Sequence, residues 1–284
     1  MSILVITLAK NDLEGLKRTE RSIDSQSTKV IWTIITPNDN SPTHQYAQNI
    51  FTTGKAESII FDEGLGIYHS MNLGIFGVEK QEWIWFLNSG DEFAFNDTYE
   101  MALETLTSCG KRWIFGGHFL GSSSGDIFGE VSSPFTFRPE RQLFAKNYIS
   151  HQSTIFEAKF LQELGGFDED YKMAADWDLM VRASKVDPGY RVSIPLSVFY
   201  MGGLSTRSRS VGNKELFILR KKHLSSKFAM RSYLWFLYRS VRNLCVQSLE
   251  NKFPTFADKV RKLRLNVRHR LASTTIINSE IGKS

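Results

Sequence analysis

The sequence contains little cysteine and no long apolar run. Its 284 residues include only Cys109 and Cys245, which lie far apart and form no CxxC pair, so neither a disulfide framework nor a structural zinc site is expected. Seven prolines and 20 glycines exclude a collagen-like or low-complexity chain. No stretch approaches the roughly 20 consecutive apolar residues that a transmembrane helix needs. With 42% hydrophobic residues, the chain can still form a substantial globular core.

The beginning of the chain does not have the composition of a secretion signal. The apolar stretch at residues 3–8 is as short as a β-strand, and no basic residue precedes it. We therefore expect a cytoplasmic protein. A peripheral position at the inner face of the cell membrane is also expected if the basic residues of the C-terminal part, described below, bind anionic lipid.

Acidic and basic residues are distributed unevenly along the chain. Residues 213–284 contain 16 Lys and Arg but only 4 Asp and Glu, a net charge of +12. Residues 1–212 contain the other 19 Lys and Arg against 26 Asp and Glu, a net charge of −7. This asymmetry predicts a boundary near Gly212, between a globular domain at 1–212 and a basic helical extension at 213–284.

Short apolar stretches alternate with helical patterns in the globular domain. The apolar stretches predict strands at residues 3–8, 30–35, 58–61, 83–87 and 113–115. Hydrophobic residues at helical spacing predict helices at residues 12–26 with Asp12 as N-cap, 44–51, 67–78, 160–164 with Gly165 at the end, and 176–185. The alternation predicts an α/β fold with a mostly parallel sheet flanked by helices.

Polar segments follow the second, third and fourth predicted strands, at residues 36–40, 62–66 and 88–91. In open parallel sheets, ligands bind beyond the carboxyl ends of the strands. These three segments are therefore expected to meet at one edge of the sheet and to form a site there.

Three clusters of residues could carry chemistry. In residues 62–72, glycines precede a predicted helix, where backbone N–H groups favour anions, although an ordinary capped loop explains the pattern equally well. In residues 86–93, Asp91 follows a buried strand and offers a hard oxygen ligand to Mg²⁺ or Mn²⁺, with a simple turn as the alternative. Asp176 lies among apolar residues and can be either a general base or a helix N-cap.

In this order and spacing, the clusters resemble the inverting family 2 glycosyltransferases with the GT-A fold, over residues 1–206. The likeness is greatest to a bacterial branch whose members build surface polysaccharides. The shared strings are Gly66-Ile-Tyr-His-Ser-Met-Asn72, Phe86-Leu-Asn-Ser-Gly-Asp91, His151-Gln152 and Ala175-Asp-Trp-Asp-Leu179.

The resemblance implies a Rossmann-like GT-A domain that moves a hexosyl group from a nucleotide-diphosphate sugar to a hydroxyl of a glycan or lipid-linked saccharide. Asp176 matches the catalytic base, and Asp91 matches the ligand of a divalent cation, Mn²⁺ or Mg²⁺. The residues that match nucleotide-sugar contacts are Thr36, Asn38, Asp39, Asp62, Gly64, Gly66, Tyr68, Asn72, Asn88, Ser89 and Asp91. Those that match the acceptor or diphosphate region are His151, Gln152, Trp177, Gly203 and Ser205.

The sequence departs from the family pattern at several of these positions. Thr36 and Pro37 stand where the family commonly has Asp-Gly, and Gly64 and His69 stand where Asp is common. Asp91 is the single carboxylate that remains of the usual metal motif. A cation would therefore be held by fewer protein ligands than is usual.

Two other functional classes remain open at this point. A nucleotidyltransferase would use a similar site, but the chain lacks a Gly-rich triphosphate loop with a Lys near its N-terminus. A non-catalytic scaffold with the same fold would recruit partners through the basic extension. The presence of both Asp91 and Asp176 argues against a scaffold, which needs neither.

The basic extension contains amphipathic helical patterns, with apolar residues recurring from Leu216 to Leu244 and again from Phe256 to Leu271. Lys and Arg lie between them. One interpretation is a peripheral contact with an anionic membrane surface through residues 213–284. The other is packing of the apolar stripe on the globular domain or on a second subunit. Nucleic acid is not expected as a partner, because no recognition motif is present and the domain is acidic.

Overall fold

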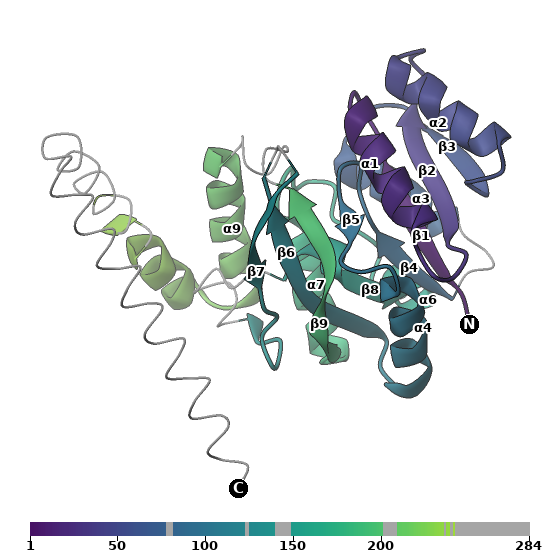
Figure 1. The fold of residues 1–284 in the computed structure, drawn as a ribbon. Coiled ribbons are helices and arrows are strands. Elements are labelled where there is room, and N and C mark those ends of the chain that lie inside the picture. Colours follow the sequence, from purple (N-terminus) through teal and green to yellow (C-terminus); the bar gives the residue numbers. More distant parts are fainter. Residues whose placement is uncertain are drawn as a thin grey trace, which may run out of the picture. The chain divides into compact units, whose positions relative to one another are not determined.

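The computed structural model describes residues 1–77, 82–122, 125–139, 149–200, 209–235, 237–238 and 241. The chain divides into two compact units, and the first ends at Ser226. In this first unit, strands and helices alternate as drawn in Figure 1: β1 (Ile3–Leu8), α1 (Leu13–Asp24), β2 (Ile31–Pro37), α2 (Pro42–Thr52), β3 (Ser58–Asp62), α3 (Ile67–Phe76), β4 (Trp83–Phe86), β5 (Glu92–Phe93), α4 (Thr98–Ser108), β6 (Trp113–Gly121), β7 (Ile127–Val131), the 3-10 turn η1 (His151–Ser153), β8 (Thr154–Glu157), α6 (Ala158–Glu163), α7 (Ala175–Val186), β9 (Tyr190–Tyr200) and α9 (Arg209–His223).

The strands form one mixed sheet in the order β3-β2-β1-β4-β8-β6-β9-β5, and β7 pairs with β6. The first four strands in chain order are parallel to one another, as predicted. β8 runs antiparallel to both β4 and β6, whereas β9 is parallel to β6. The carboxyl ends of β1 to β4, β6 and β9 and the amino end of β8 therefore lie along one edge of the sheet, which we call the site edge.

Helices cover both faces of the sheet, because alternate side chains of a strand point to opposite faces. Ile3 and Val5 of β1 pack with residues of α1, α2 and α4, whereas Leu4 and Ile6 pack with residues of α3, α6, α7 and α9. Each strand of this central part is thus buried on both sides. This explains why these strands appear in the sequence as continuous apolar runs rather than as alternating patterns.

Capping residues begin and end several helices where the sequence predicts it. Asp12 is the N-cap of α1, and its Oδ1 accepts the N–H of Gly15 at 3.1 Å. Gly165 follows α6 with φ of 79°, the left-handed conformation that glycine adopts readily. The N-cap alternative for Asp176 is wrong, because α7 begins at Ala175 and Asp176 lies inside its first turn.

Several elements of the second half of the domain differ from the prediction. β6 continues to Gly121, well beyond the predicted residues 113–115, and pairs with β7 through a hairpin. The helix α4 and the strands β5, β8 and β9 were not predicted. β5 and β8 have only two and four residues, which is too short to show a period. The sequence does carry a signal for the other two elements, because β9 alternates apolar and other residues from Tyr190 to Val198 and α4 has Tyr99, Ala102 and Leu106 at helical spacing.

The predicted boundary at Gly212 lies inside α9. Leu216 and Leu219 of this helix belong to the same hydrophobic core as α7. In the second unit, residues 227–235 are helical, and exposed apolar side chains of this segment include Tyr233, Leu234 and Trp235. Across the described ranges, no helix has both the length and the apolar character required to cross a membrane.

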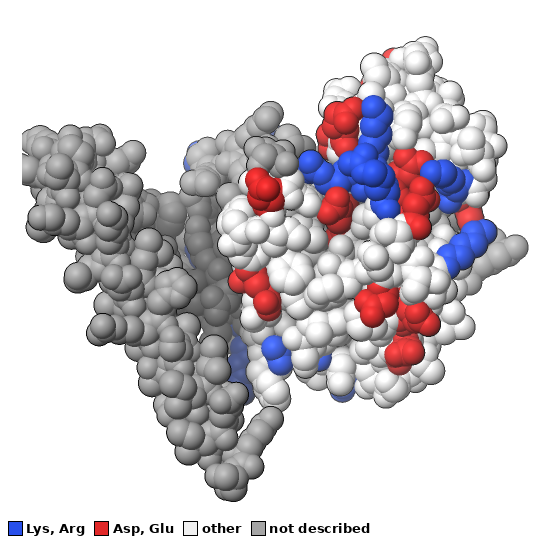
Figure 2. Space-filling view, in the orientation of Figure 1, with Lys and Arg blue, Asp and Glu red and all other residues white. Residues whose placement is uncertain are grey.

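The face of the first unit that carries α1 has charges of both signs (Figure 2). Lys17 pairs with Glu14 at 2.8 Å, and Lys55 pairs with Glu20 and Asp24 at 2.7 and 2.6 Å. The Lys17–Glu14 and Lys55–Asp24 pairs are solvent-exposed and contribute little to stability, whereas Glu20 is buried. These pairs do balance the charge around α1, so this face offers no patch of a single sign to a charged partner.

Candidate active site

The polar segments that follow β2, β3 and β4 meet at the site edge, as the sequence predicts. Pro37 at the end of β2 pairs with Asp62 at the end of β3. The N–H of Ser89, just after β4, donates to the carbonyl of Leu8 at the end of β1, at 3.1 Å. The turn η1 brings His151 to the same edge at the amino end of β8.

Asn88, His151 and Asp176 form a line of polar side chains at this edge. The amide Nδ2 of Asn88 lies 3.1 Å from Nε2 of His151. On the other side of the ring, Nδ1 lies 3.9 Å from Oδ2 of Asp176. Because an amide NH₂ group only donates, Nε2 accepts in this contact and Nδ1 carries the ring proton, which faces Asp176. Burial lowers the pKa of His151 to about 4, so the ring is neutral near pH 7.

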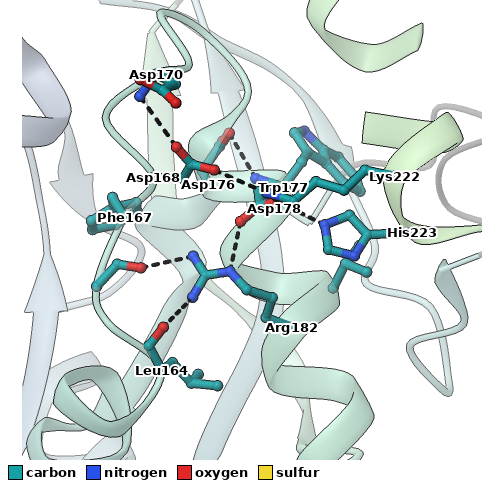
Figure 3. Close-up of polar contacts among 12 residues, drawn as sticks. Leu164, Phe167, Asp168, Asp170, Asp176, Trp177, Asp178, Arg182, Lys222 and His223 are labelled. Atoms are coloured by element: carbon teal, nitrogen blue, oxygen red, sulfur yellow. Dashed lines mark hydrogen bonds and ion pairs between the residues drawn. The ribbon is translucent and has the colours of Figure 1, made fainter. Parts of the chain in front are cut away.

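Asp176 is a partly buried carboxylate held at the start of α7, with 19% of its side chain exposed (Figure 3). Its Oδ1 accepts the N–H of Trp177 at 2.9 Å, and its carboxylate also accepts a hydrogen bond from the Tyr68 hydroxyl. It lines a small, mostly apolar cavity together with His151 and Phe167. Burial raises the pKa of Asp176 to about 6, although the hydrogen bonds act in the opposite direction. A carboxylate with a pKa near 6 can accept a proton efficiently at neutral pH.

Asp91 lies in the turn between β4 and β5 and is also buried. Its N–H donates to the carbonyl of Asn88 at 2.9 Å, and its own carbonyl accepts the hydroxyl of Thr19 at 2.8 Å. Its carboxyl group is hydrogen-bonded to the side chain of Gln152. Burial raises the pKa of Asp91 to about 8, and the nearby charge of Asp12 acts in the same direction.

Oxygen atoms suited to a divalent cation lie on Asp91 and Asn88. The side-chain carbonyl oxygen of Asn88 is buried and has no hydrogen-bond partner. Within the described part of the chain, no three His, Cys, Asp or Glu residues gather in a way that would hold a metal ion. This donor set fits Mg²⁺ or Mn²⁺ only if the ion takes most of its ligands from a phosphorylated substrate, as Mg²⁺ commonly does in nucleotide sites.

The loops after β2 and β3 provide polar side-chain atoms and backbone N–H groups that no side chain caps. The hydroxyl oxygen of Thr36 is buried without a hydrogen-bond partner. Asp62 Oδ1 accepts the N–H of Gly64 at 2.8 Å, and Gly64 has a φ of 81° that favours glycine. Gly66, with φ of 136°, precedes α3, and no side chain caps this helix. The N–H groups of its first turn are therefore free to bind an anion.

Other predicted contact residues are engaged within the protein. The amide of Asn72 binds the N–H and carbonyl of Phe167 and the carboxylate of Glu169, at 2.7–2.9 Å. Ser89 donates to Asp12 at 3.0 Å, and Asp39 accepts the N–H of Ser41 at 3.0 Å. These three side chains hold the loops of the site edge in place.

The remaining predicted residues occupy different positions. Asn38 is exposed in the loop after β2, and Trp177 is buried beside Asp176. Gln152 is buried and holds Asp91. Gly203 and Ser205 lie outside the described residues, so their roles stay predictions.

Two further residues near this edge were not predicted. Lys10 follows β1, and a Cβ atom placed on Gly64 would lie 3.9 Å from its Nζ. Its position after the first predicted strand was the available signal, because β1 lies where the strand order reverses. Glu215 of α9 is buried against the loop that precedes Asp176. No local pattern could place it there.

Comparisons with known proteins find similarity to glycosyltransferases. The chain is 29% identical, over 193 residues, to an uncharacterized glycosyltransferase of Mycobacterium tuberculosis, a match that covers 65% of this chain and 70% of the relative. It is 25% identical, over 189 residues, to a PGL/p-HBAD biosynthesis glycosyltransferase of Mycobacterium bovis, covering 64% of this chain and 69% of that protein. No protein-family model matches the chain.

Solved structures share the fold at low sequence identity. S. aureus TarS in complex with UDP-GlcNAc superposes with a TM-score of 0.61 at 14% identity, covering 80% of this chain and 69% of the TarS chain. A mannosyltransferase of Pyrobaculum calidifontis in complex with GDP-Man and Mn²⁺ gives a TM-score of 0.57 at 13% identity, covering 90% of this chain and 82% of that chain. The fold is therefore GT-A-like.

Proposed function

We propose that this protein is an inverting glycosyltransferase that moves a hexosyl group from a nucleotide-diphosphate sugar to an acceptor hydroxyl. The observation that carries the proposal is the line Asn88–His151–Asp176 at the site edge, which ends in a partly buried carboxylate with a raised pKa. The GT-A-like fold and the glycosyltransferase relatives support the same class of reaction.

Asp176 is the base in this proposal. It takes the proton from the acceptor hydroxyl while that oxygen forms a bond to the anomeric carbon of the donor. The bond between the anomeric carbon and the diphosphate oxygen breaks, and its electron pair leaves with the diphosphate. Because the acceptor oxygen enters on the face opposite the diphosphate, the configuration at the carbon inverts. The N–H of Trp177 and the hydroxyl of Tyr68 hold the carboxylate in one orientation during this step.

The neutral ring of His151 acts as a donor beside the base. Its Nδ1–H faces Asp176, and Asn88 fixes the ring from the other side. An N–H group in this position can bind an oxygen of the acceptor or of the diphosphate. Its burial keeps the ring uncharged, so it does not form a salt bridge that would lower the basicity of Asp176.

Asp91, with the side-chain oxygen of Asn88, would hold the divalent cation. A bound Mg²⁺ or Mn²⁺ offsets the negative charge that develops on a departing diphosphate. The loop from Asp62 to Gly66 and the hydroxyl of Thr36 would contact the nucleotide, and the free N–H groups at the start of α3 would contact its phosphates.

The acceptor in this proposal is a glycan or a lipid-linked saccharide of surface polysaccharide or glycolipid biosynthesis. The relative named for PGL/p-HBAD biosynthesis supports a glycolipid role. The exposed aromatic side chains of Tyr233, Trp235 and Tyr238 and the net charge of +12 at residues 213–284 support a contact with an anionic membrane, where such acceptors reside.

Calorimetry with a series of nucleoside diphosphates, with and without Mn²⁺, tests the proposal. We expect at least one of them to bind, and Mn²⁺ to strengthen binding in the wild type but much less in Asp91→Asn. Asp97→Asn is the matched control, because Asp97 is exposed a few residues further along the chain and does not cap α4 with its side chain.

Two results would contradict the proposal, one from this calorimetry extended to nucleotide sugars and one from a turnover assay with nucleoside triphosphates. Lack of binding by every nucleoside diphosphate and nucleotide sugar, with and without Mn²⁺, would favour a non-catalytic scaffold. Turnover of a nucleoside triphosphate with release of pyrophosphate would favour a nucleotidyltransferase.

A further inference from the structure

Glu215 binds the loop that leads into the base helix. It lies on α9, in the basic part of the chain, and its carboxylate is buried. Oε1 accepts the N–H of Lys172 and Oε2 accepts the N–H of Met173, each at 2.8 Å. One carboxylate thus satisfies two consecutive backbone N–H groups of a segment that belongs to no helix or strand.

A second contact joins the end of α9 to the base helix (Figure 3). Asp178 of α7 is fully buried, and its Oδ1 lies 2.6 Å from Nε2 of His223 and 3.2 Å from Nζ of Lys222. Its Oδ2 accepts the Nε–H of Arg182 at 2.6 Å. Burial by itself would raise the pKa of Asp178, but the hydrogen bonds of His223 and Arg182 hold it well below its ordinary range.

These two contacts lie on either side of Asp176 in the sequence. Glu215 holds residues 172 and 173, before the base, and His223 holds Asp178, after it. The carboxylate of Asp176 must stay within a few tenths of an ångström of its reacting position, since an error of about 1 Å can cost about 100-fold in rate. Without Glu215 of α9, the loop before α7 would lack the two hydrogen bonds that its N–H groups now make.

We propose that Glu215 is a positioning residue for Asp176, through which α9 holds the base and its loop in the reactive arrangement. The inference rests on the proposed function, because it assigns Asp176 the role of base. It gives this part of the basic extension a task within the catalytic domain that is separate from any membrane contact.

The charge of Glu215 also acts on the base. The groups that face Asp176 are the neutral ring of His151, the hydroxyl of Tyr68, the N–H of Trp177 and, at longer range, the carboxylate of Glu215. Glu215 is the one negative charge among these, and it raises the pKa of Asp176.

The test compares the wild type with Glu215→Gln, Glu215→Asp and Lys221→Gln. Lys221 is exposed on the same helix, so its variant is the matched control. We expect Glu215→Gln to lower kcat about tenfold with little change in the KM for the donor. We also expect the acidic limb of its kcat/KM profile to move to lower pH. Glu215→Asp keeps the charge, so it should lose part of kcat while its acidic limb stays in place.

Amide hydrogen exchange provides a measurement that does not depend on turnover. In the wild type, the N–H groups of Lys172 and Met173 should be protected, and in Glu215→Gln they should exchange faster, while the protection of β1 is unchanged. Unprotected amides at these two positions in the wild type would overturn the inference even if no Glu215 variant folds.

The outcomes separate the inference from the proposed function. If the wild type turns over a nucleotide sugar and Glu215→Gln keeps both its kcat and its acidic limb, the positioning role is wrong and the proposed function stands. If the wild type turns over no nucleotide sugar, the proposed function fails, and with it the role of Glu215 in catalysis.

Discussion

His151 Nδ1 lies 3.9 Å from Oδ2 of Asp176, although the two residues belong to different elements, the turn before β8 and the first turn of α7. The distance is longer than a hydrogen bond. His151 therefore does not bind the carboxylate directly, whereas Oδ1 is bound by the N–H of Trp177. The carboxylate of Asp176 is thus held by a backbone N–H and by the hydroxyl of Tyr68, and the ring of His151 lies beside it.

Replacement of the base should remove most of the activity. We expect Asp176→Asn to lower kcat by about 100- to 10,000-fold, because the amide has the same shape but cannot take a proton. The measurement is release of nucleoside diphosphate from the donor sugar. Asp170→Asn, an exposed position in the preceding loop, should remain close to wild type. Wild-type turnover by the Asp176 variant would show that another group is the base.

The wild type should lose activity in mild acid. The base acts only when ionised, and burial raises its pKa to about 6, so kcat/KM should fall as the pH decreases through about 6. If the base had the ordinary aspartate pKa near 3.9, kcat/KM would fall at a pH about two units lower. A profile measured from pH 8 to about 4.5 separates the two, and a flat profile through pH 6 would contradict the assignment.

The Asp176→Asn substitution should stabilise the folded protein at neutral pH. A carboxyl group with a raised pKa in the folded state destabilises that state when it is ionised. For Asp176 this penalty is complete above about pH 6 and is absent below about pH 4. We expect Asp176→Asn to increase the free energy of unfolding by about 1–3 kcal/mol at pH 7 and by much less at pH 4. Denaturant titration at both values measures the difference.

Asp178→Asn is the internal control for this effect, with the opposite sign. Asp178 is fully buried, and hydrogen bonds from His223 and Arg182 lower its pKa, so its ionised form stabilises the fold at pH 7. That contribution is lost as the pH falls below about 4. We expect the variant to lose on the order of 3 kcal/mol at pH 7. If Asp176→Asn and Asp178→Asn changed the free energy of unfolding at pH 7 in the same direction, the assigned difference between the two environments would be wrong.

The loop before Asp176 should be sensitive to a methyl group at Gly166. A Cβ atom there would lie 2.4 Å from Oδ1 of Asn72, and Gly166 has a φ of 68°. Gly54 has a φ of 76° but nothing within 4 Å of a Cβ, so Gly54→Ala measures the backbone cost alone. We expect about 1–2 kcal/mol for Gly54→Ala and at least 1 kcal/mol more for Gly166→Ala in denaturant titrations. Equal losses would mean that Asn72 does not hold this loop.

The full chain should bind vesicles that contain phosphatidylserine more strongly than vesicles of phosphatidylcholine alone. The basic residues of 213–284 are attracted to anionic lipid by about 1 kcal/mol each, and added salt should weaken the binding. In a sedimentation assay, Arg231→Glu should weaken binding by about tenfold, whereas Arg138→Glu in the domain should have little effect. Equal binding to both kinds of vesicle would contradict the membrane contact. It would favour packing of the extension on the globular domain or on a second subunit.

Much of the first half of the fold was predictable because its information is local. Strands β1, β2 and β4 are short apolar runs that are buried on both faces, and the helices between the strands carry apolar residues at regular spacing. The site edge follows from this alternation, since parallel strands place their carboxyl ends together. Asp62, Asn88 and Asp91 could therefore be assigned to one edge from their positions after strands.

The second half depends on pairings that no local pattern encodes. β8 has only four residues and is antiparallel to both of its neighbours. Its direction decides that His151 and Gln152, just before it, lie beside Asn88 and Asp91. The residues could be identified as candidates from their chemical types and from the resemblance, but their distances could not.

The sequence by itself determined the α/β class, the order of the first strands, the position of the polar segments and the asymmetry of charge. Only the tertiary structure decided which polar atoms find partners: it assigns Asn72 to the loop at Phe167, Asp178 to His223, and Glu215 to the backbone before the base. The physical reason is that periodicity reports which side of an element is buried. The partner of a buried polar group depends instead on atoms that long-range packing brings within about 3 Å.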